Sequence, residues 1–171
     1  RKFARARALK KAITAWEPRN IGADYVASLN GSLCAADSTP ESVVLQYLHY
    51  WSRRNYGGMA SLFWSGVTKY SKGFAREIRE RYEPIVPKSY SLSHIEDKAS
   101  VISEVDAVID NGSAPRRWTF RLTRENEPDN VVADNLLGGP WRIVLIRQSP
   151  LAESEAGHDG LLGDPSSSPP T

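Results

Sequence analysis

The spacing of apolar residues changes at Pro87, and this change constrains the fold more than any other feature of the sequence. Before Pro87, apolar residues recur every three or four positions, which is the period of one helix face. After Pro87 they alternate with polar residues, as in strands that have one buried face. The stretch 116–126 is the clearest case, because Trp118, Phe120 and Leu122 alternate with arginine and threonine.

Helices followed by strands predict an α+β domain with an antiparallel sheet packed on helices, and they argue against a doubly wound sheet, in which the two would alternate. The predicted strands cover residues 89–96, 99–110, 116–126 and 141–146. In the last of these, Trp141, Ile143 and Leu145 are expected on one face and Val144 and Ile146 on the other.

Three helices are expected before the strands. They cover residues 1–16, 38–55 and 73–85. The second has the clearest start, since Ser38 or Thr39 can cap it and Pro40 suits the first helical position. The glycines at 57 and 58 are expected to stop or kink this helix, and a further short helical piece is expected from Met59 onward.

The net charge of +2 hides an asymmetry between the two ends of the chain. Residues 1–20 carry seven Lys or Arg and one Glu, whereas residues 150–171 carry four acids and no Lys or Arg. The body between them is close to neutral. We expect a basic helical arm with a connector over 1–38, a folded domain over 39–148, and a flexible acidic, Pro- and Ser-rich tail over 149–171.

Two stretches resemble the nuclear transport factor 2-like superfamily, which includes ketosteroid isomerase and the SnoaL-type polyketide cyclases. PESVVLQYLHYWSRRNYGGMASLF is similar to its opening helix and hinge, and GPWRIVLI is similar to its final strand. The resemblance covers roughly residues 39–148. It implies a strongly bent, cone-like antiparallel sheet that holds the N-terminal helices in its concave face, with a cavity at the open end. Members include enzymes, small-molecule binders and protein-interaction subunits, so the fold alone does not select a function.

Most residues expected to line such a cavity are aromatic. They are Tyr47, Tyr50, Trp51, His94, Trp118, Phe120 and Trp141. A filled core is the preferred interpretation of these rings, and a pocket for a flat or apolar ligand is the alternative. His94 alternates with Tyr90 and Leu92, so it is expected on the inner side, where the resemblance places an enzyme's carboxylate or histidine. Glu104 and Asp106 are expected to point outward, and no catalytic residue is assigned.

Residues suited to metals or cofactors are sparse. The three histidines and the single cysteine, Cys34, have no paired metal-ligand spacing, and no glycine-rich phosphate loop precedes a helix. We therefore expect no metal and no cofactor. Cys34 is expected to be an inert thiol, and one cysteine cannot form an internal disulfide.

The basic N-terminal segment has three interpretations. Its candidate binding residues are Phe3, Arg5, Arg7, Leu9, Lys10, Lys11, Ile13 and Trp16. It is a solvated helix, or it docks on a partner protein, or it contacts an anionic membrane surface or nucleic acid. A homodimer is a further expectation, through a sheet face that carries Arg117, Arg121, Val144 and Ile146.

These features favour a non-catalytic accessory subunit of a larger protein assembly, and the alternative is a small-molecule binder or an isomerase- or cyclase-type enzyme. A domain of a membrane-anchored secretion or conjugation protein is a third interpretation. A start at Arg1 that is rich in Arg and poor in acids is typical of a chain processed near an organellar targeting sequence. The expected location is a chloroplast, a mitochondrion or the cytoplasm, with any membrane association made through partners.

Overall fold

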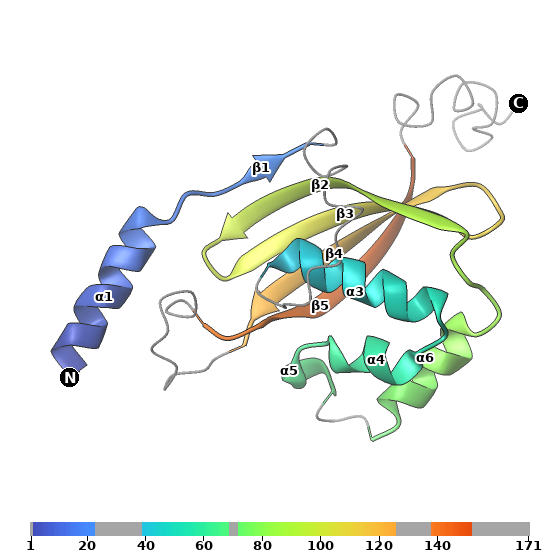
Figure 1. The fold of residues 1–171 in the computed structure, drawn as a ribbon, viewed down its shortest axis with the longest axis horizontal. Coiled ribbons are helices and arrows are strands. Elements are labelled where there is room, and N and C mark those ends of the chain that lie inside the picture. The colour runs from blue at the N-terminus through green and yellow to red at the C-terminus, as the bar shows by residue number, and fades with distance from the viewer. Residues whose placement is uncertain (1, 23–38, 69–71, 126–137, 152–171) are drawn as a thin grey trace, which may run out of the picture.

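The computed structural model describes residues 2–22, 39–68, 72–125 and 138–151 of the 171-residue chain. Its helices are α1 (Lys2–Ala15), α3 (Pro40–Ser52), α4 (Tyr56–Ser61), α5 (Ser65–Thr68) and α6 (Phe74–Tyr82). Its strands are β1 (Asn20–Ile21), β2 (Ser89–Ala99), β3 (Ile102–Asp110), β4 (Arg116–Arg124) and β5 (Trp141–Pro150). The fold is α+β, as predicted, and every described helix precedes β2 in the chain (Figure 1).

The five strands form one antiparallel sheet in the order β1-β2-β3-β4-β5. Nothing in the sequence pattern predicts β1, in which Asn20 and Ile21 pair with Glu96 and Ile95 of β2. The segment after α1 therefore adds an edge to the sheet, and β5 forms the opposite edge.

One face of the sheet carries the hydrophobic core, and we call it the inner face. Its fully buried side chains include Ile95, Val105, Phe120, Leu122 and Ile143. Helix α3 lies across this face, α4 packs on α3, and α6 packs on α4 (Figure 1). The outer face carries the alternate residues, such as Asp106 and Arg121. Strands β3 and β4 thus have the alternation that the sequence predicts.

Helix α3 begins where the sequence predicts, because Thr39 caps it. The Thr39 Oγ1 atom accepts a hydrogen bond from the Ser42 N–H at 3.2 Å, and Pro40 lies in the first turn. The helix ends before Arg54, whose φ of 57° is left-handed. The break therefore falls earlier than the glycine pair.

Helix α4 runs through Gly57 and Gly58, so the expectation that these glycines lie between two helices is wrong. Asn55 caps α4, because its Oδ1 accepts a hydrogen bond from the Gly58 N–H at 2.8 Å. A Cβ at Gly58 would lie 2.8 Å from the ring of Tyr50. The glycine thus serves close packing of α3 against α4 and does not end a helix.

A bulge in β2 overturns the prediction that His94 lies on the inner side. The pairing passes from Leu92–Ala107 to His94–Asp106, so one residue of β2 is extra. Beyond the bulge it is Ile95 that is buried, and His94 lies on the outer face with Asp106. Alternation cannot be extrapolated across an extra residue, because each single-residue shift exchanges the two faces.

A second bulge, in β5, has the same effect. Ile143 and Leu145 pair with adjacent residues of β4, so Val144 is extra. Leu145 is 47% exposed on the outer face, whereas Ile146 packs against the core. The predicted facing of Leu145 and Ile146 is therefore wrong.

The outermost described segments are α1 at the N-terminal side and the end of β5 at the C-terminal side. Strand β5 continues to Pro150, past the expected domain end at 148, and the predicted tail from 152 onward lies outside the described residues. Helix α1 lies apart from the sheet and from the other helices (Figure 1). Within the described ranges, no helix has the length and apolar character needed to span a membrane.

Candidate functional site

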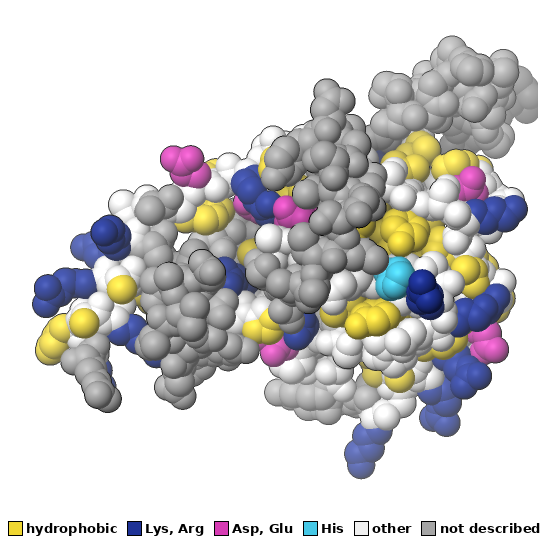
Figure 2. Space-filling view, in the orientation of Figure 1, with side chains coloured by type: hydrophobic (Ala, Val, Ile, Leu, Met, Phe, Trp, Pro, Cys, Tyr) yellow, Lys and Arg dark blue, Asp and Glu magenta, His cyan; other side chains and the backbone are white. Residues whose placement is uncertain are grey.

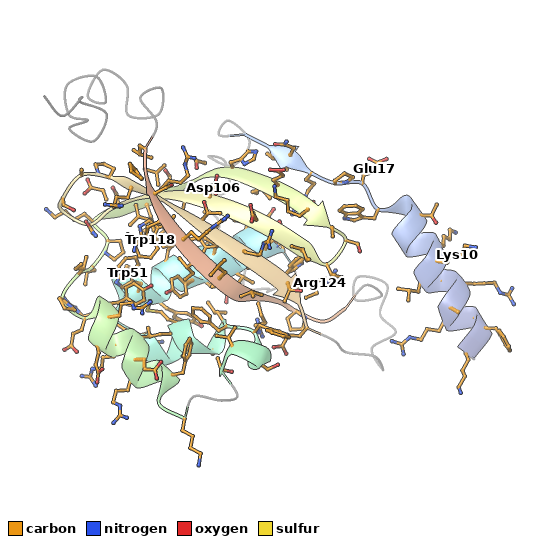
Figure 3. All side chains as sticks on the ribbon, turned by 180° about the vertical axis from the view of Figure 1, so that it is seen from behind. Lys10, Glu17, Trp51, Asp106, Trp118 and Arg124 are labelled. Atoms are coloured by element: carbon orange, nitrogen blue, oxygen red, sulfur yellow. The ribbon has the colours of Figure 1, made fainter. Side chains whose placement is uncertain are left out.

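Aromatic side chains fill the space between α3, α6 and the inner face of the sheet. The centroid of the Trp51 ring lies 4.9 Å from that of Tyr82 and 5.1 Å from that of Trp118. The Tyr47 ring lies 5.5 Å from that of Phe120 in an edge-to-face contact. Figure 3 shows Trp51 and Trp118 close together between the sheet and the helices. These contacts are those of a packed core, in which Tyr47, Trp51, Trp118 and Phe120 are buried.

The other cavity candidates also have packing roles. Trp141 is buried, with the Arg124 guanidinium 5.5 Å above its ring. Tyr50 is half-buried against the core, over Gly58. Burial raises the pKa of the Tyr47 phenol well above its usual value, so this group stays neutral at neutral pH.

His94 lies in a polar cluster on the outer face of the sheet. Its Nε2 atom is 2.6 Å from Oδ1 of Asn20, and its Nδ1 atom is 3.9 Å from the Asp106 carboxylate. The Thr119 hydroxyl donates a hydrogen bond to the same carboxylate at 2.7 Å. The cluster joins β1, β2, β3 and β4, so its contacts are those of a link between strands.

Arg19 connects three segments at the first turn of α3. Its side chain donates hydrogen bonds to Glu41 at 2.6 Å and to Asp97 at 2.9 Å, and its backbone N–H also donates to Asp97 at 2.9 Å. The Ser103 hydroxyl donates to the other oxygen of Asp97 at 2.9 Å. Sequence reasoning missed this cluster, because the two carboxylates are 22 and 78 positions from Arg19.

The electrostatics of this cluster favour its charged forms. The side chains of Glu41 and Asp97 are only 8% and 7% exposed. Burial alone would raise the pKa of Asp97, but the hydrogen bonds from Arg19 outweigh it and hold that pKa below its usual value. Burial also opposes the charge of Arg19, yet its bonds to both carboxylates hold its pKa above the usual range. A carboxylate held ionised in this way is a poor general acid or base near neutral pH.

Helix α1 is basic over residues 2–11. It carries Lys2, Arg5, Arg7, Lys10 and Lys11 and contains no Asp or Glu. Phe3 is 80% exposed, while Leu9 and Trp16 are partly buried; the side chain of Ile13 lies outside the described atoms. Figure 2 shows basic side chains gathered around this end of the molecule, and Figure 3 shows Lys10 on the helix, well away from the sheet.

A groove of about 280 Å³ lies between β5 and the helices α5 and α6. Its apolar walls include Phe63, Val67, Phe74, Ile78, Val144 and Ile146. Glu77, Arg81 and Gln148 supply polar groups. None of the seven predicted cavity residues lines it. The one sequence signal for the groove is the apolar face of α6, with Phe74 and Ile78 one helical turn apart.

The edge of β5 beside this groove is only partly covered by backbone of the described residues. The Ile143 N–H donates to the Leu62 carbonyl, and the Trp64 N–H donates to the Ile143 carbonyl, both at 2.8 Å. This pairing stops where α5 begins. Successive residues of an antiparallel strand direct their backbone N–H and C=O groups to opposite sides of the strand. When the extra residue Val144 is counted, the N–H and C=O groups of Ile146 and Gln148 point away from β4.

The described residues contain no cluster of three or more His, Cys, Asp or Glu that could hold a metal ion. No family model matches the sequence, and neither a curated protein nor a solved structure matches it. Any assignment of function therefore rests on the chain's own residues.

Proposed function

We propose that this chain is a non-catalytic accessory subunit of a larger protein assembly, which docks through helix α1 and the outer face of the sheet. The observation that carries the proposal is the contrast between a body whose interior is filled with aromatic rings and a basic helix displayed apart from it. We further propose that the sheet and helices form the cone of the nuclear transport factor 2-like superfamily. The order of the elements and the position of α3 across the sheet support that likeness.

The chemistry of the buried carboxylates argues against acid–base catalysis. An isomerase-type mechanism requires a carboxylate or histidine inside the cavity that can exchange a proton with the ligand, and a pKa raised by an apolar site favours this. Asp97 has the opposite shift, and Glu41 is bridged to the same guanidinium. Tyr47 lies among rings, and His94 lies on the outer face.

Helix α1 supplies the two components of a docking element. Phe3 is a large apolar side chain left exposed, and exposed aromatic residues are frequent anchors of protein interfaces. The lysines and arginines around it form a cationic rim that steers an acidic partner. Because α1 carries no acidic residue, this charge is not neutralised within the helix.

The outer face of β4 and β5 is the second candidate surface. Arg117, Arg121 and Arg147 lie on it beside the exposed Leu145. A second copy of the chain docked here would bring arginines close to arginines, which costs free energy. The face therefore favours an acidic partner over a homodimer.

The alternative function, a small-molecule binder or isomerase, has less support. The groove beside β5 measures about 280 Å³, which is just below the range of about 300–1,000 Å³ typical of ligand pockets. Its polar groups, Glu77 and Arg81, lie one helical turn apart on α6 and have opposite charge. This arrangement offers no base poised for proton transfer.

The test is affinity purification of the tagged full chain from its native cells at moderate salt, beside a variant that lacks residues 1–17. We expect the partner complex to be lost with the deletion while the circular dichroism and melting temperature of the body are unchanged. Two point variants separate the sources of binding: Phe3→Ala removes the apolar anchor, and a double change of Lys10 and Lys11 to Gln removes two charges. A protein partner loses roughly tenfold or more in affinity with Phe3→Ala.

Anionic vesicles and a DNA duplex serve as comparison probes for the same variants. Binding to the duplex depends on the lysines and falls steeply with salt, but it is insensitive to Phe3→Ala. Binding to vesicles depends on the lysines and also on Phe3, so direct binding to the vesicle probe identifies a membrane surface. Partner association that survives deletion of residues 1–17, or turnover of a substrate by the purified chain, would contradict the proposal.

A further inference from the structure

We propose that the groove between β5 and α6 binds an extended, acidic peptide segment of a partner protein, which adds a strand to the edge of the sheet at β5. The surface is separate from α1, so this inference goes beyond the docking role proposed above and can fail or succeed independently of it.

The backbone of β5 provides the first element of such a site. The chain's own residues 62–64 already pair with this edge at Ile143, which shows that β5 can accept a neighbour on this side. The pairing ends at α5, while β5 continues to Pro150. The N–H and C=O groups of Ile146 and Gln148 point toward the groove, so an incoming strand can continue the ladder from that point.

The groove provides the second element, because it lies beneath the inner side of that edge. Side chains of an added strand alternate between the two faces of the sheet. Those on the inner side would enter the space bounded by Phe63, Val67, Ile78 and Ile146. A volume of about 280 Å³ suits a few apolar side chains of a peptide, and apolar residues are therefore expected at alternate positions of the partner.

Charge provides the third element and sets the chemistry of the other positions. Strands β4 and β5 together contain six arginines and no Asp or Glu. On the outer face, Glu104 of β3 is already shared by Lys98 at 3.9 Å and by Arg121 and Arg147 at 3.2 Å each. Lys98 is also paired with Glu96 at 3.0 Å, so two carboxylates face three cations on this face. Outward side chains of the added strand would lie beside Arg147, where an acidic residue completes the charge balance.

The same arginines argue against a second copy of this chain as the occupant. Pairing β5 with β5 of another copy would add no carboxylate to this edge and would place Arg147 near the arginines of the other strand. A charged side chain on an edge strand is a known device against such self-pairing.

The experiment measures binding of a fluorescent ten-residue peptide, the length of β5, that alternates Val and Glu. Two control peptides have Lys in place of Glu, or the same composition with the Val residues grouped together. Fluorescence anisotropy with the full chain is expected to show binding of the alternating Val–Glu peptide at least tenfold tighter than of either control.

The deciding variant is Gln148→Pro, with Gln148→Ala as its matched control. Proline removes the edge-facing N–H but leaves the pairing of β5 with β4, because proline is tolerated on edge strands where the N–H faces outward. We expect Gln148→Pro to weaken peptide binding roughly tenfold, as the loss of one backbone hydrogen bond predicts, and Gln148→Ala to leave it unchanged. Val67→Glu, at a half-buried position of α5 that lines the groove, is expected to weaken it as well, by placing an acid at the groove wall.

Equal binding by the Pro and Ala variants, or by the Glu and Lys peptides, would overturn the proposal. Tighter peptide binding by a chain that ends at Leu151 would assign the groove to the chain's own acidic tail instead. A dimer that Gln148→Pro converts to monomer in sedimentation would assign the edge to a second copy. Competition by a single-stranded oligonucleotide that is equally strong against both variants would assign the arginines to nucleic acid. The variant without residues 1–17 is expected to bind the peptide normally, so failure here is distinguishable from failure of the α1 proposal.

Discussion

Among single residues, Arg19 holds together parts of the chain that are distant in sequence. Its guanidinium and backbone N–H bind Asp97 of β2, and its remaining arm binds Glu41 of α3. The two carboxylates are nearly buried, so removal of the cation leaves two charges without their partner.

Replacement of Arg19 by Met should destabilise the fold by about 2 kcal/mol, which is below the value for a fully buried pair because Arg19 is partly exposed. Urea denaturation monitored by tryptophan fluorescence measures this change. Arg19→Lys is the control: it keeps the charge but lacks the forked geometry, so it should recover only part of the loss. Equal stability of the Met variant and the parent would mean that the cluster contributes nothing.

The same cluster predicts a pH dependence. The pKa of Asp97 is lower in the folded chain than its unfolded value of about 3.9, so its contribution to stability is complete above that value. The contribution is lost as the pH falls through the lower folded pKa. The difference in unfolding free energy between the parent and Arg19→Met should therefore shrink between pH 5 and pH 2, measured by urea denaturation at each pH. A difference that grows on acidification would contradict the assignment.

Residue types explain why part of the site was predictable. The rings of Tyr47, Trp51, Trp118 and Phe120 lie inside because helical or strand periodicity places them on one face. No periodicity links Arg19 to Asp97, because the contact depends on how the segment after α1 pairs with β2. Such contacts belong to tertiary structure, and the spacing of residues in the sequence carries no trace of them.

At the level of helices and strands, the start of α3 depends on one side chain. The Thr39 hydroxyl accepts the Ser42 N–H and donates to the Ser42 hydroxyl. Thr39→Ala should cost about 1 kcal/mol in unfolding free energy, and Thr39→Ser should cost little because serine keeps the oxygen. Thermal denaturation of both variants measures the effect, and a loss of equal size in both would exclude capping as its cause.

Strand periodicity succeeded or failed according to the presence of bulges. It predicted β3 and β4 residue by residue, because the pairing between them contains no extra residue. It failed for His94 in β2 and for Leu145 and Ile146 in β5, each beyond a single extra residue. A bulge is defined by how one strand pairs with its neighbour, so the polar–apolar pattern of a single strand does not reveal where a bulge lies.

On the scale of the whole molecule, the basic helix and the body are joined by a short segment that ends at Arg19. A chain that lacks residues 1–16 should keep the melting temperature of the full chain, because Figure 1 shows α1 apart from the body. A chain that lacks residues 1–19 should melt about 5 °C lower, since it also loses Arg19 and its bonds to Glu41 and Asp97. Differential scanning calorimetry compares the two shortened chains. Equal melting temperatures would show that the Arg19 cluster does not stabilise the body.

The position of Arg19 also has a mechanical consequence. Tension that a bound partner applies to α1 reaches the body through Pro18 and arrives first at this guanidinium. Its bonds run to the first turn of α3 and to the C-terminal end of β2, so the load is shared before the two residues of β1 separate from β2. The domain therefore has its strongest polar contacts close to the point where the force would enter it.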